Sequence, residues 1–478
     1  MKRTQKEKPG RKNNNPWRLL LILSLLWLAN CNRQVQNQVP GQDPQPELRP
    51  KFETIKSLGL QQEKAYDFLK LITSVGGRLT GSPEADRAVE ITSALMSELG
   101  FDRVWTEPVR VGRWVRGAAE QASVRMAGND KQTLAICALG NSVATPPEGL
   151  EAGVVEVRSF EELTAMKDKI PGRIVFYNTP MDRTAAEPFV AYGQAAQFRV
   201  RGAVEAARHG ARAVLVRSMT FRIDDNPHAG LMEYDDSLPK IPAAAVSTAG
   251  AENLHRWLHS DPELKLWLKL DCRQEQSVTS ANVIGELTGS VFPEEIILVG
   301  GHLDSWDLSP GAHDDAAGSA VAIEVLRLIK ESGLRPKRTI RAVLFMDEEF
   351  GGTGGRAYAA SKNRNSEKHL VAIEQDRGGA APVGLAFGQE ILKEKLKQLE
   401  TYLEPLGINW IRSGGGGVDI APLKKKGAVL GALIPGSQRY FDYHHSALDV
   451  PEAVSPRELE LQAVILAMVA YFLAEEGV

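Results

Sequence analysis

Short apolar runs alternate with longer amphipathic stretches along the second half of the chain. We predict buried strands at 296–299, 340–346, 369–373 and 428–430 and helices at 318–330 and 456–475. A further helix is expected from Pro83 to Leu99, because Ser82 suits the N-cap and Gly100 suits the left-handed position after the last turn. Strands that alternate with helices predict an α/β fold, with a mixed, largely parallel sheet flanked by helices.

The middle of the chain has a different pattern of apolar residues. Between about 111 and 279 short apolar strands recur at 173–177, 213–216 and 243–246, and a helical stretch ends near His209. This pattern resembles a protease-associated domain, a smaller domain that is inserted in several zinc exopeptidases. We therefore expect catalytic parts at 52–110 and 280–478, with the insert at 111–279 between them.

The first 51 residues are predicted to contain a targeting signal and a flexible tether. A basic start precedes an apolar run at 19–28, which is too short to span a membrane and is typical of a secretory signal. The run ends in Leu-Ala-Asn-Cys31, which resembles a bacterial lipoprotein box and implies lipidation of Cys31 after removal of the leader. An ordinary signal peptide or an uncleaved anchor is the alternative. Residues 32–51 are rich in Gln and Pro and predict a tether.

Composition narrows the classes of function. The 478 residues exceed the size of one hydrophobic core, and 43% apolar with 24% charged residues exclude a disordered chain, a fibre and a polytopic membrane protein. The net charge of -3 gives no support for nucleic-acid binding. Three cysteines exclude a disulfide scaffold and a cysteine-rich zinc module, so any metal must rely on His, Asp and Glu.

Acids and histidines follow the predicted strands. They are His302, Asp304, His313, Asp314, Asp315, Glu348, Glu349, Asp376, His444 and His445. Ligands of open α/β sheets bind beyond the carboxyl ends of the strands, so we expect these side chains to converge at one edge. So many carboxylates repel one another unless cations are present, and His with carboxylate ligands suits catalytic Zn²⁺. Two ions about 3.5–4 Å apart would use them all.

The same motifs, in the same order, resemble the di-zinc exopeptidase family of aminopeptidases and glutamate carboxypeptidases. The matching segments are His302-Leu-Asp-Ser, His313-Asp-Asp-Ala-Ala-Gly, Glu348-Glu349, Asp376 and His445. The resemblance implies two Zn²⁺ per chain, one on His302 and Asp376 and one on Glu349 and His445, with Asp314 between them. It further implies a cis Asp314–Asp315 bond, Asp304 as the group that orients His302, and Glu348 as the general base.

Three carboxylate ligands and two Zn²⁺ leave one positive charge, which a bound hydroxide would neutralise. The expected reaction is therefore peptide hydrolysis by a metal-bound hydroxide, with dipeptides or short peptides as substrates. Whether His444 or His445 is the ligand stays open at this point, although only His445 has the Ser neighbour that the family shows.

The sequence indicates residues that contact the substrate less clearly than it indicates the metal ligands. The glycine loop that begins at Ser413 could bring backbone amides to a bound peptide, or it could be a surface loop. Asp419 could hold a substrate amine or fix that loop, and Tyr443 could contact a substrate carboxylate together with Arg439 and Tyr440.

Other functions remain open for this set of residues. An aminopeptidase with broad specificity, a glutaminyl cyclase-like enzyme and a non-catalytic binding relative are the alternatives to a dipeptidase or carboxypeptidase. The expected location is extracytoplasmic, either secreted or held at the membrane through a lipid on Cys31. No nucleic-acid partner is expected, and the sequence leaves a homodimer open.

Overall fold

The structure, a computed structural model, describes residues 45–125 and 131–478. Within these two ranges no helix combines the length and the apolar character that a membrane crossing requires. The leader, Cys31 and most of the expected tether lie outside the described residues. Helix α2 (Arg49–Gln62) begins inside the segment predicted as tether, because Phe52 and Ile55 lie on one helix face and are buried in the core.

The first sheet is mixed and has parallel strands at its centre. Its order is β1-β10-β12-β11-β13-β16-β14-β15. The strands are β1 (Arg103–Val115), β10 (Arg273–Leu287), β11 (Phe292–His302), β12 (Arg338–Phe345), β13 (Lys368–Glu374), β14 (Pro382–Phe387), β15 (Trp410–Ser413) and β16 (Val429–Pro435). β12, β11, β13 and β16 run parallel to one another, so their carboxyl ends meet at one edge. The predicted α/β fold is confirmed.

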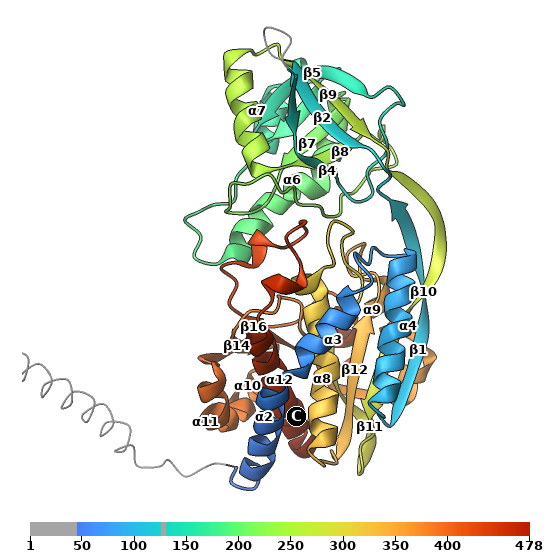
Figure 1. Ribbon diagram of the computed structural model, residues 1–478, viewed down its shortest axis with the longest axis vertical. Helices are drawn as coiled ribbons and strands as arrows, with labels where there is room; N and C mark the ends of the chain where they lie inside the picture. The colour runs from blue at the N-terminus through green and yellow to red at the C-terminus, as the bar shows by residue number, and fades with distance from the viewer. Residues whose placement is uncertain (1–44, 126–130) are drawn as a thin grey trace, which may run out of the picture. The chain divides into compact units, whose positions relative to one another are not determined.

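Helices cover both faces of this sheet. They are α2, α3 (Lys64–Thr73), α4 (Pro83–Glu98), α8 (Ala317–Glu331), α9 (Thr353–Ala360), α10 (Glu390–Leu396), α11 (Glu400–Leu403) and α12 (Pro456–Glu476). Figure 1 shows α8 and α12 beside β11 and β12, and both helices contact these strands. Alternation along β11 explains the two layers, since Ile297 and Val299 join the core under α8 and α12 while Ile296 and Leu298 join the core under α9.

Short turns connect these elements. They include 3-10 turns at Lys167–Lys169, Lys362–Ser366, Lys397–Leu399, Glu404–Leu406, Ala421–Lys426, Tyr440–Asp442 and Pro451–Ala453. An irregular turn at Ala312–Ala316 precedes α8. The predicted start of α4 is confirmed, because the Ser82 hydroxyl accepts a hydrogen bond from the Ala85 amide at 3.1 Å.

A second sheet, with its own hydrophobic core, is formed by the middle of the chain. Its order is β3-β2-β9-β5-β6-β7-β8-β4. Its elements are β2 (Glu120–Arg125), β3 (Lys131–Leu134), β4 (Ile136–Ala138), β5 (Leu150–Val157), α5 (Phe160–Ala165), β6 (Ile174–Tyr177), α6 (Pro188–Arg208), β7 (Ala213–Arg217), β8 (Ala243–Val246), α7 (Thr248–Ser260) and β9 (Lys265–Leu270). β1 and β10, which pair with each other in the first sheet, cross the boundaries expected at 110/111 and 279/280.

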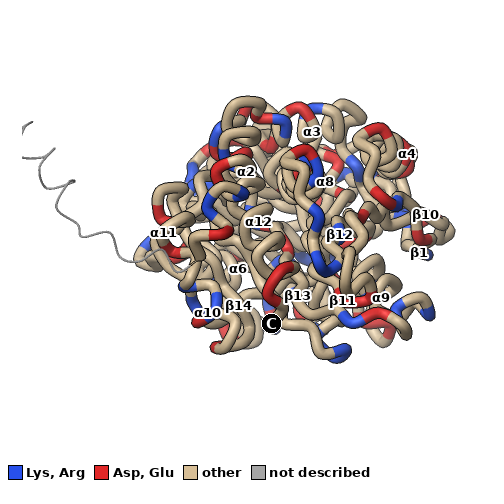
Figure 2. Tube along the Cα trace, turned by 90° about the horizontal axis from the view of Figure 1, so that it is seen from below, with Lys and Arg blue, Asp and Glu red and all other residues tan. Residues whose placement is uncertain are grey.

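Charged side chains of both signs are mixed in the described chain, and its two thiols are buried. In the view of Figure 2, Lys and Arg segments are interspersed with Asp and Glu segments around the tube. Cys137 and Cys272 are both buried and free. Burial raises the pKa of the Cys137 thiol to about 12, so this side chain acts as a small apolar group.

Candidate metal centre

The predicted acids and histidines follow the parallel strands of the first sheet. His302 is the last residue of β11, Glu348 and Glu349 follow β12, and Asp376 follows β13. Because these strands are parallel neighbours, their carboxyl ends present the side chains at a common edge. His445 follows β16, the next parallel strand of the sheet. The convergence at one edge that the sequence predicted is therefore what the fold produces.

Asp314 lies at the middle of the cluster. Its Oδ1 is 3.1 Å from His302 Nε2, and its Oδ2 is 3.2 Å from His445 Nε2. Asp376 Oδ1 is 3.6 Å from the same nitrogen of His302, and Glu349 Oε2 is 3.2 Å from the same nitrogen of His445. The cluster thus has two halves, each made of one imidazole and one carboxylate, with one oxygen of Asp314 directed to each half.

Three overlapping groups in this cluster have ligand atoms close enough to share a metal ion. They are His302 with Asp314 and Glu349, His302 with Asp315 and Asp376, and Asp314 with His444 and His445. The His444 Nε2 atom is 3.6 Å from Asp314 Oδ2, farther than His445 Nε2. Only His445 is also near Glu349. The geometry therefore favours His445 over its neighbour as the fifth member of the set.

Two carboxylate oxygens of the cluster are not satisfied by hydrogen bonds within the protein. Asp314 Oδ2 and Glu349 Oε1 are buried and have no hydrogen-bond partner within residues 45–125 and 131–478. A buried carboxylate oxygen without a partner costs free energy, and a cation would satisfy it. Oxygen and imidazole donors at this spacing are the ligands that Zn²⁺ takes in catalytic sites. The residues present therefore fit the metal that the resemblance implies.

Electrostatics lead to the same conclusion. Burial raises the pKa of Glu348 well above its usual value, and the carboxylates of Asp376 and Glu349 raise it further. Burial and the carboxylate of Asp314 likewise raise the pKa of Glu349. Burial would lower the pKa of His302, but the carboxylates around it, Asp314 among them, raise it well above the usual value. The raised pKa values mean that the cluster holds protons to balance its crowded negative charge. A divalent cation bound there would balance the same charge in place of the protons.

The carboxylate of Asp304 fixes the turn after β12. Its oxygens accept hydrogen bonds from the amides of Asp347 at 2.8 Å, Glu348 at 3.1 Å and Glu349 at 3.3 Å. The Thr80 hydroxyl donates a fourth hydrogen bond at 2.6 Å. The Asp304 carbonyl oxygen is 2.9 Å from Nδ1 of His302, and the Asp304 carboxylate oxygen Oδ1 is 3.7 Å from the same nitrogen. Asp304 thus positions Glu348 and Glu349 as well as the imidazole.

Asp449 and the chain geometry hold Asp314 in place. The carboxylate of Asp449 accepts hydrogen bonds from the amides of His313 at 2.6 Å and Asp314 at 3.1 Å. The Asp314–Asp315 peptide bond is cis, as the resemblance implied. The carboxylate of Asp315 accepts a hydrogen bond from the His302 amide at 3.0 Å, which ties the turn to the end of β11. His313 itself points away, to the Ala453 carbonyl at 3.2 Å.

Two contributors to the centre were missed by sequence reasoning. The Trp306 indole donates a hydrogen bond to Glu349 Oε2 at 2.6 Å, leaving the other oxygen of Glu349 without a partner. Ala229, from the segment between β7 and β8 of the second sheet, donates its amide to the His445 carbonyl at 2.8 Å, and its own carbonyl is 3.3 Å from His445 Nδ1. Backbone contacts such as those of Ala229 leave no signal in the sequence.

The three weaker substrate candidates occupy different surroundings. Ser413 is exposed at the edge of the first sheet and donates a hydrogen bond to Glu390. Asp419 is buried, and neither of its carboxylate oxygens has a hydrogen-bond partner in the part of the chain that the structure describes. Burial and the neighbouring Glu374 raise its pKa well above the usual value. Tyr443 stacks on His313 with ring centroids 4.9 Å apart, beside the cluster.

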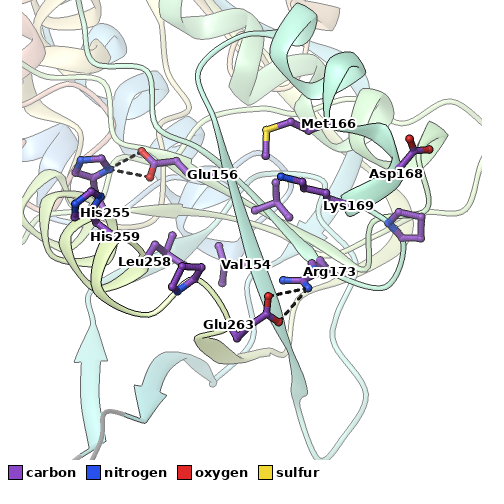
Figure 3. Close-up of a pocket in the computed structure, with 13 residues that line it drawn as sticks. Val154, Glu156, Met166, Asp168, Lys169, Arg173, His255, Leu258, His259 and Glu263 are labelled. Atoms are coloured by element: carbon purple, nitrogen blue, oxygen red, sulfur yellow. Dashed lines mark hydrogen bonds and ion pairs between the residues drawn. The ribbon is translucent and has the colours of Figure 1, made fainter.

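A separate cavity of about 730 Å³ is lined by β5 of the second sheet, by α7 and by the segment 166–173 (Figure 3). The picture shows two pairs of polar side chains in it, His255 with Glu156 at 2.8 Å and Arg173 with Glu263 at 3.2 Å. None of its lining residues belongs to the three groups of possible metal ligands found in the described residues. The cavity therefore does not contribute to the metal centre.

Comparison with known proteins gives consistent matches. The model of peptidase family M28 matches residues 282–470. Carboxypeptidase Q of Homo sapiens is 37% identical over 419 residues, which cover 87% of this chain and 86% of the relative. Carboxypeptidase Q of Xenopus laevis is 34% identical and covers 96% of this chain and 98% of the relative.

Solved structures agree with these relatives. A peptidase M28 precursor from Shewanella amazonensis superposes with a TM-score of 0.84 and 33% identity, covering 90% of this chain and 97% of that one. A zinc aminopeptidase from Bacillus subtilis superposes with a TM-score of 0.62 and 20% identity, covering 87% of this chain and 95% of that one. The second likeness concerns the fold alone.

Proposed function

Because this chain belongs to peptidase family M28 and is a zinc-dependent exopeptidase, we propose that it hydrolyses dipeptides or short peptides. The observation that carries the proposal is the two-sided cluster around Asp314, in which an imidazole and a carboxylate flank each of its oxygens. The carboxypeptidase Q relatives, which the chain covers almost throughout, support a dipeptidase or carboxypeptidase over the other members of the family.

Two Zn²⁺ ions would be held by five side chains. His302 and Asp376 would hold one ion, Glu349 and His445 the other, and Asp314 would give one oxygen to each. The unpartnered oxygens of Asp314 and Glu349 support this assignment. Three carboxylates would offset three of the four positive charges, which suits a site that must stabilise developing negative charge on a substrate oxygen.

Bound zinc would supply Lewis-acid polarisation of the scissile carbonyl and would lower the pKa of a water molecule. The side chains of the protein would do the rest. The half-buried carboxylate of Glu348 would take a proton from the attacking water and return it to the leaving amine nitrogen. Asp304 would keep Glu348 at this position through the amide hydrogen bonds of the turn after β12. Trp306 would hold Glu349 through its indole hydrogen bond.

The proposal is tested by metal analysis joined to a substrate panel. We expect two zinc ions per purified chain, loss of activity with a chelator and recovery with added Zn²⁺. The panel contains an unblocked dipeptide, the same dipeptide with a blocked amino group, an amino-acid anilide and a peptide with N-terminal glutamine. Hydrolysis of the unblocked dipeptide above all others is the expected result.

Each other outcome identifies a rival function. Faster turnover of the anilide would indicate an aminopeptidase, and cyclisation of the glutamine peptide would indicate a glutaminyl cyclase-like enzyme. Zinc binding without turnover of any compound would indicate a binding relative.

The second sheet and the N-terminus complete the proposal. We propose that the second sheet is a protease-associated-type insert whose Ala229 backbone steadies His445, and that a lipid on Cys31 anchors an extracytoplasmic enzyme. Incorporation of labelled fatty acid into the wild-type chain, but not into a Cys31→Ser variant, is the expected result for the anchor. Light scattering of the chain without its leader tests whether it forms the homodimer that the sequence left open.

A further inference from the structure

A cavity of about 280 Å³ is lined by residues next in sequence to those of the metal centre. Three of its lining residues are direct chain neighbours of members of the cluster: His313 precedes Asp314, Arg377 follows Asp376, and Tyr443 precedes the two histidines. Pockets for small ligands begin at roughly this volume. The cavity is therefore lined by the same chain segments that carry the cluster.

Arg377 carries an uncommitted charge in this cavity. Among the residues that the structure describes, its guanidinium has neither an ion pair nor a side-chain hydrogen bond. Its Cζ atom lies 4.6 Å from the centre of the Phe189 ring. Stacking on an aromatic face restrains the plane of a guanidinium but uses none of its five N–H donors. The side chain is half-buried, so these donors point into a partly dehydrated space.

The aromatic ring that Arg377 stacks on belongs to helix α6, which contacts the second sheet. Phe189 is the second residue of α6, and its ring stacks on Tyr440 with centroids 5.3 Å apart and contacts Phe441 at 4.9 Å. This aromatic cluster joins α6 to the turn that precedes His444 and His445. Arg377 is thus held between the two sheets, in a fixed orientation next to the metal centre.

The other charges of the cavity leave it positive. Arg439, which also lines it, donates to the Tyr443 hydroxyl and lies 4.0 Å from Asp442, with 72% of its side chain exposed. Glu458 is the one acid in the lining. Arg377 is the better ligand for an anion, because it is less hydrated than Arg439 and has no competing partner among the described residues.

We propose that Arg377 is the specificity-determining residue that binds the free α-carboxylate of the residue that follows the scissile bond. This inference rests on the proposed peptidase function. Neighbouring Cα atoms of a peptide are about 3.8 Å apart, so the carboxylate of a dipeptide lies one residue beyond the reacting carbonyl. Arg377 directly follows Asp376 and lines the cavity, and a guanidinium can bind a carboxylate with two parallel hydrogen bonds.

The test compares alanyl-leucine with its C-terminal amide. The wild-type chain is expected to favour the free carboxylate, and Arg377→Gln is expected to lower the ratio of the two kcat/KM values by about 10- to 100-fold, the usual effect of losing a charge-assisted hydrogen bond. The loss should fall on KM rather than kcat, since the carboxylate is bound equally before and during the reaction. Arg377→Lys should give an intermediate ratio, because it keeps the charge and loses the paired donors.

A matched control is available on the same helix as Phe189. Arg201 also lies over an aromatic ring, that of Phe160, but pairs with Glu205 and is exposed. Arg201→Gln should keep the wild-type ratio. An unchanged ratio in Arg377→Gln, or an equal fall for both substrates, would overturn the proposal, as would a lowered ratio in Arg439→Gln alone.

Binding measured without turnover separates this inference from the proposed function. Calorimetric titration of the zinc-loaded Glu348→Gln variant with alanyl-leucine and its amide should show preference for the free acid. Adding Arg377→Gln should abolish that preference. If the wild-type chain cleaves neither compound, the proposed function fails, while the calorimetric preference still decides whether Arg377 binds carboxylates.

Discussion

Two buried clusters of charged side chains lie along β12 and differ in one respect. In the middle of the strand, the guanidinium of Arg341 donates hydrogen bonds to Glu286 at 2.7 Å, to Glu367 at 2.8 Å and to the hydroxyl of Tyr358 at 2.9 Å. At the end of the strand, Glu349 joins the metal centre and leaves one buried oxygen without a partner. The first cluster supplies its own cation, whereas the second is complete only with a cation from outside.

The difference separates a structural cluster from a functional one. Both contain buried carboxylates, so burial alone does not identify a site. Charge balance does, because Arg341, Arg103 and Arg364 pair with the carboxylates of the first cluster, while the acids around Asp314 raise one another's pKa.

The largest effect is expected from a change at the metal centre. Glu348→Gln removes the group proposed to transfer protons, so kcat should fall by about 10²–10⁴-fold, the usual contribution of a general acid–base residue. Zinc content should stay at the wild-type value, because Glu348 is not among the proposed ligands. Steady-state kinetics and metal analysis on the same sample check both points. Near-normal turnover by a variant that retains its zinc would show that another group is the base.

The Arg341 cluster should respond in stability instead of activity. Arg341→Met removes the buried partner of Glu286 and Glu367, which keep Arg103 at 3.0 Å and Arg364 at 3.3 Å, so the free energy of unfolding should fall by about 3 kcal/mol, the lower end for a broken buried pair. Urea denaturation measures this loss, and kcat of the folded variant should stay at the wild-type value. Arg87→Met is the control, because its ion pair with Glu90 is exposed and should contribute less than about 1 kcal/mol. A loss as small as that of the control would mean that the cluster does not depend on its arginine.

A third cluster, under α12, is expected to give the smallest effect. Burial and the carboxylate of Glu324 raise the pKa of Glu460 to about 9. Arg327 pairs with Glu324 at 2.6 Å. Glu460 accepts the Ala65 amide at 3.0 Å, and its other oxygen has no hydrogen-bond partner among the described residues. Between the usual pKa of Glu and about 9, the folded chain keeps a proton that the unfolded chain releases, so stability falls as the pH rises.

Glu460→Gln removes this titration while keeping the acceptor for Ala65. The free energy of unfolding at pH 8 should rise by the order of 1 kcal/mol, and its decline between pH 6 and pH 9 should become shallower. Denaturation curves at several pH values measure both. A variant that is less stable than the wild type at pH 8 would show that Glu460 is ionised and paired in the folded protein.

Much of the first sheet could be predicted from apolar runs. The strands at β11, β12, β13 and β16 and the helices α8 and α12 are buried on one or both faces, and burial gives them continuous apolar sequences. β1 and β10 escaped prediction because they are half-exposed partners of each other and alternate irregularly. The start of α2 was also missed, because the Gln- and Pro-rich composition before it hid the few apolar residues that pack into the core.

The sequence by itself determined which side chains could form the centre, because acids and histidines that follow parallel strands must meet at one edge of the sheet. It also determined the family, through motifs such as His302-Leu-Asp-Ser and Glu348-Glu349. Only the tertiary structure decided that His445 lies nearer than His444 to Asp314, and that Ala229 of the second sheet reaches the same imidazole. These last features depend on distances between segments that are remote along the chain, and no local pattern of residues encodes such distances.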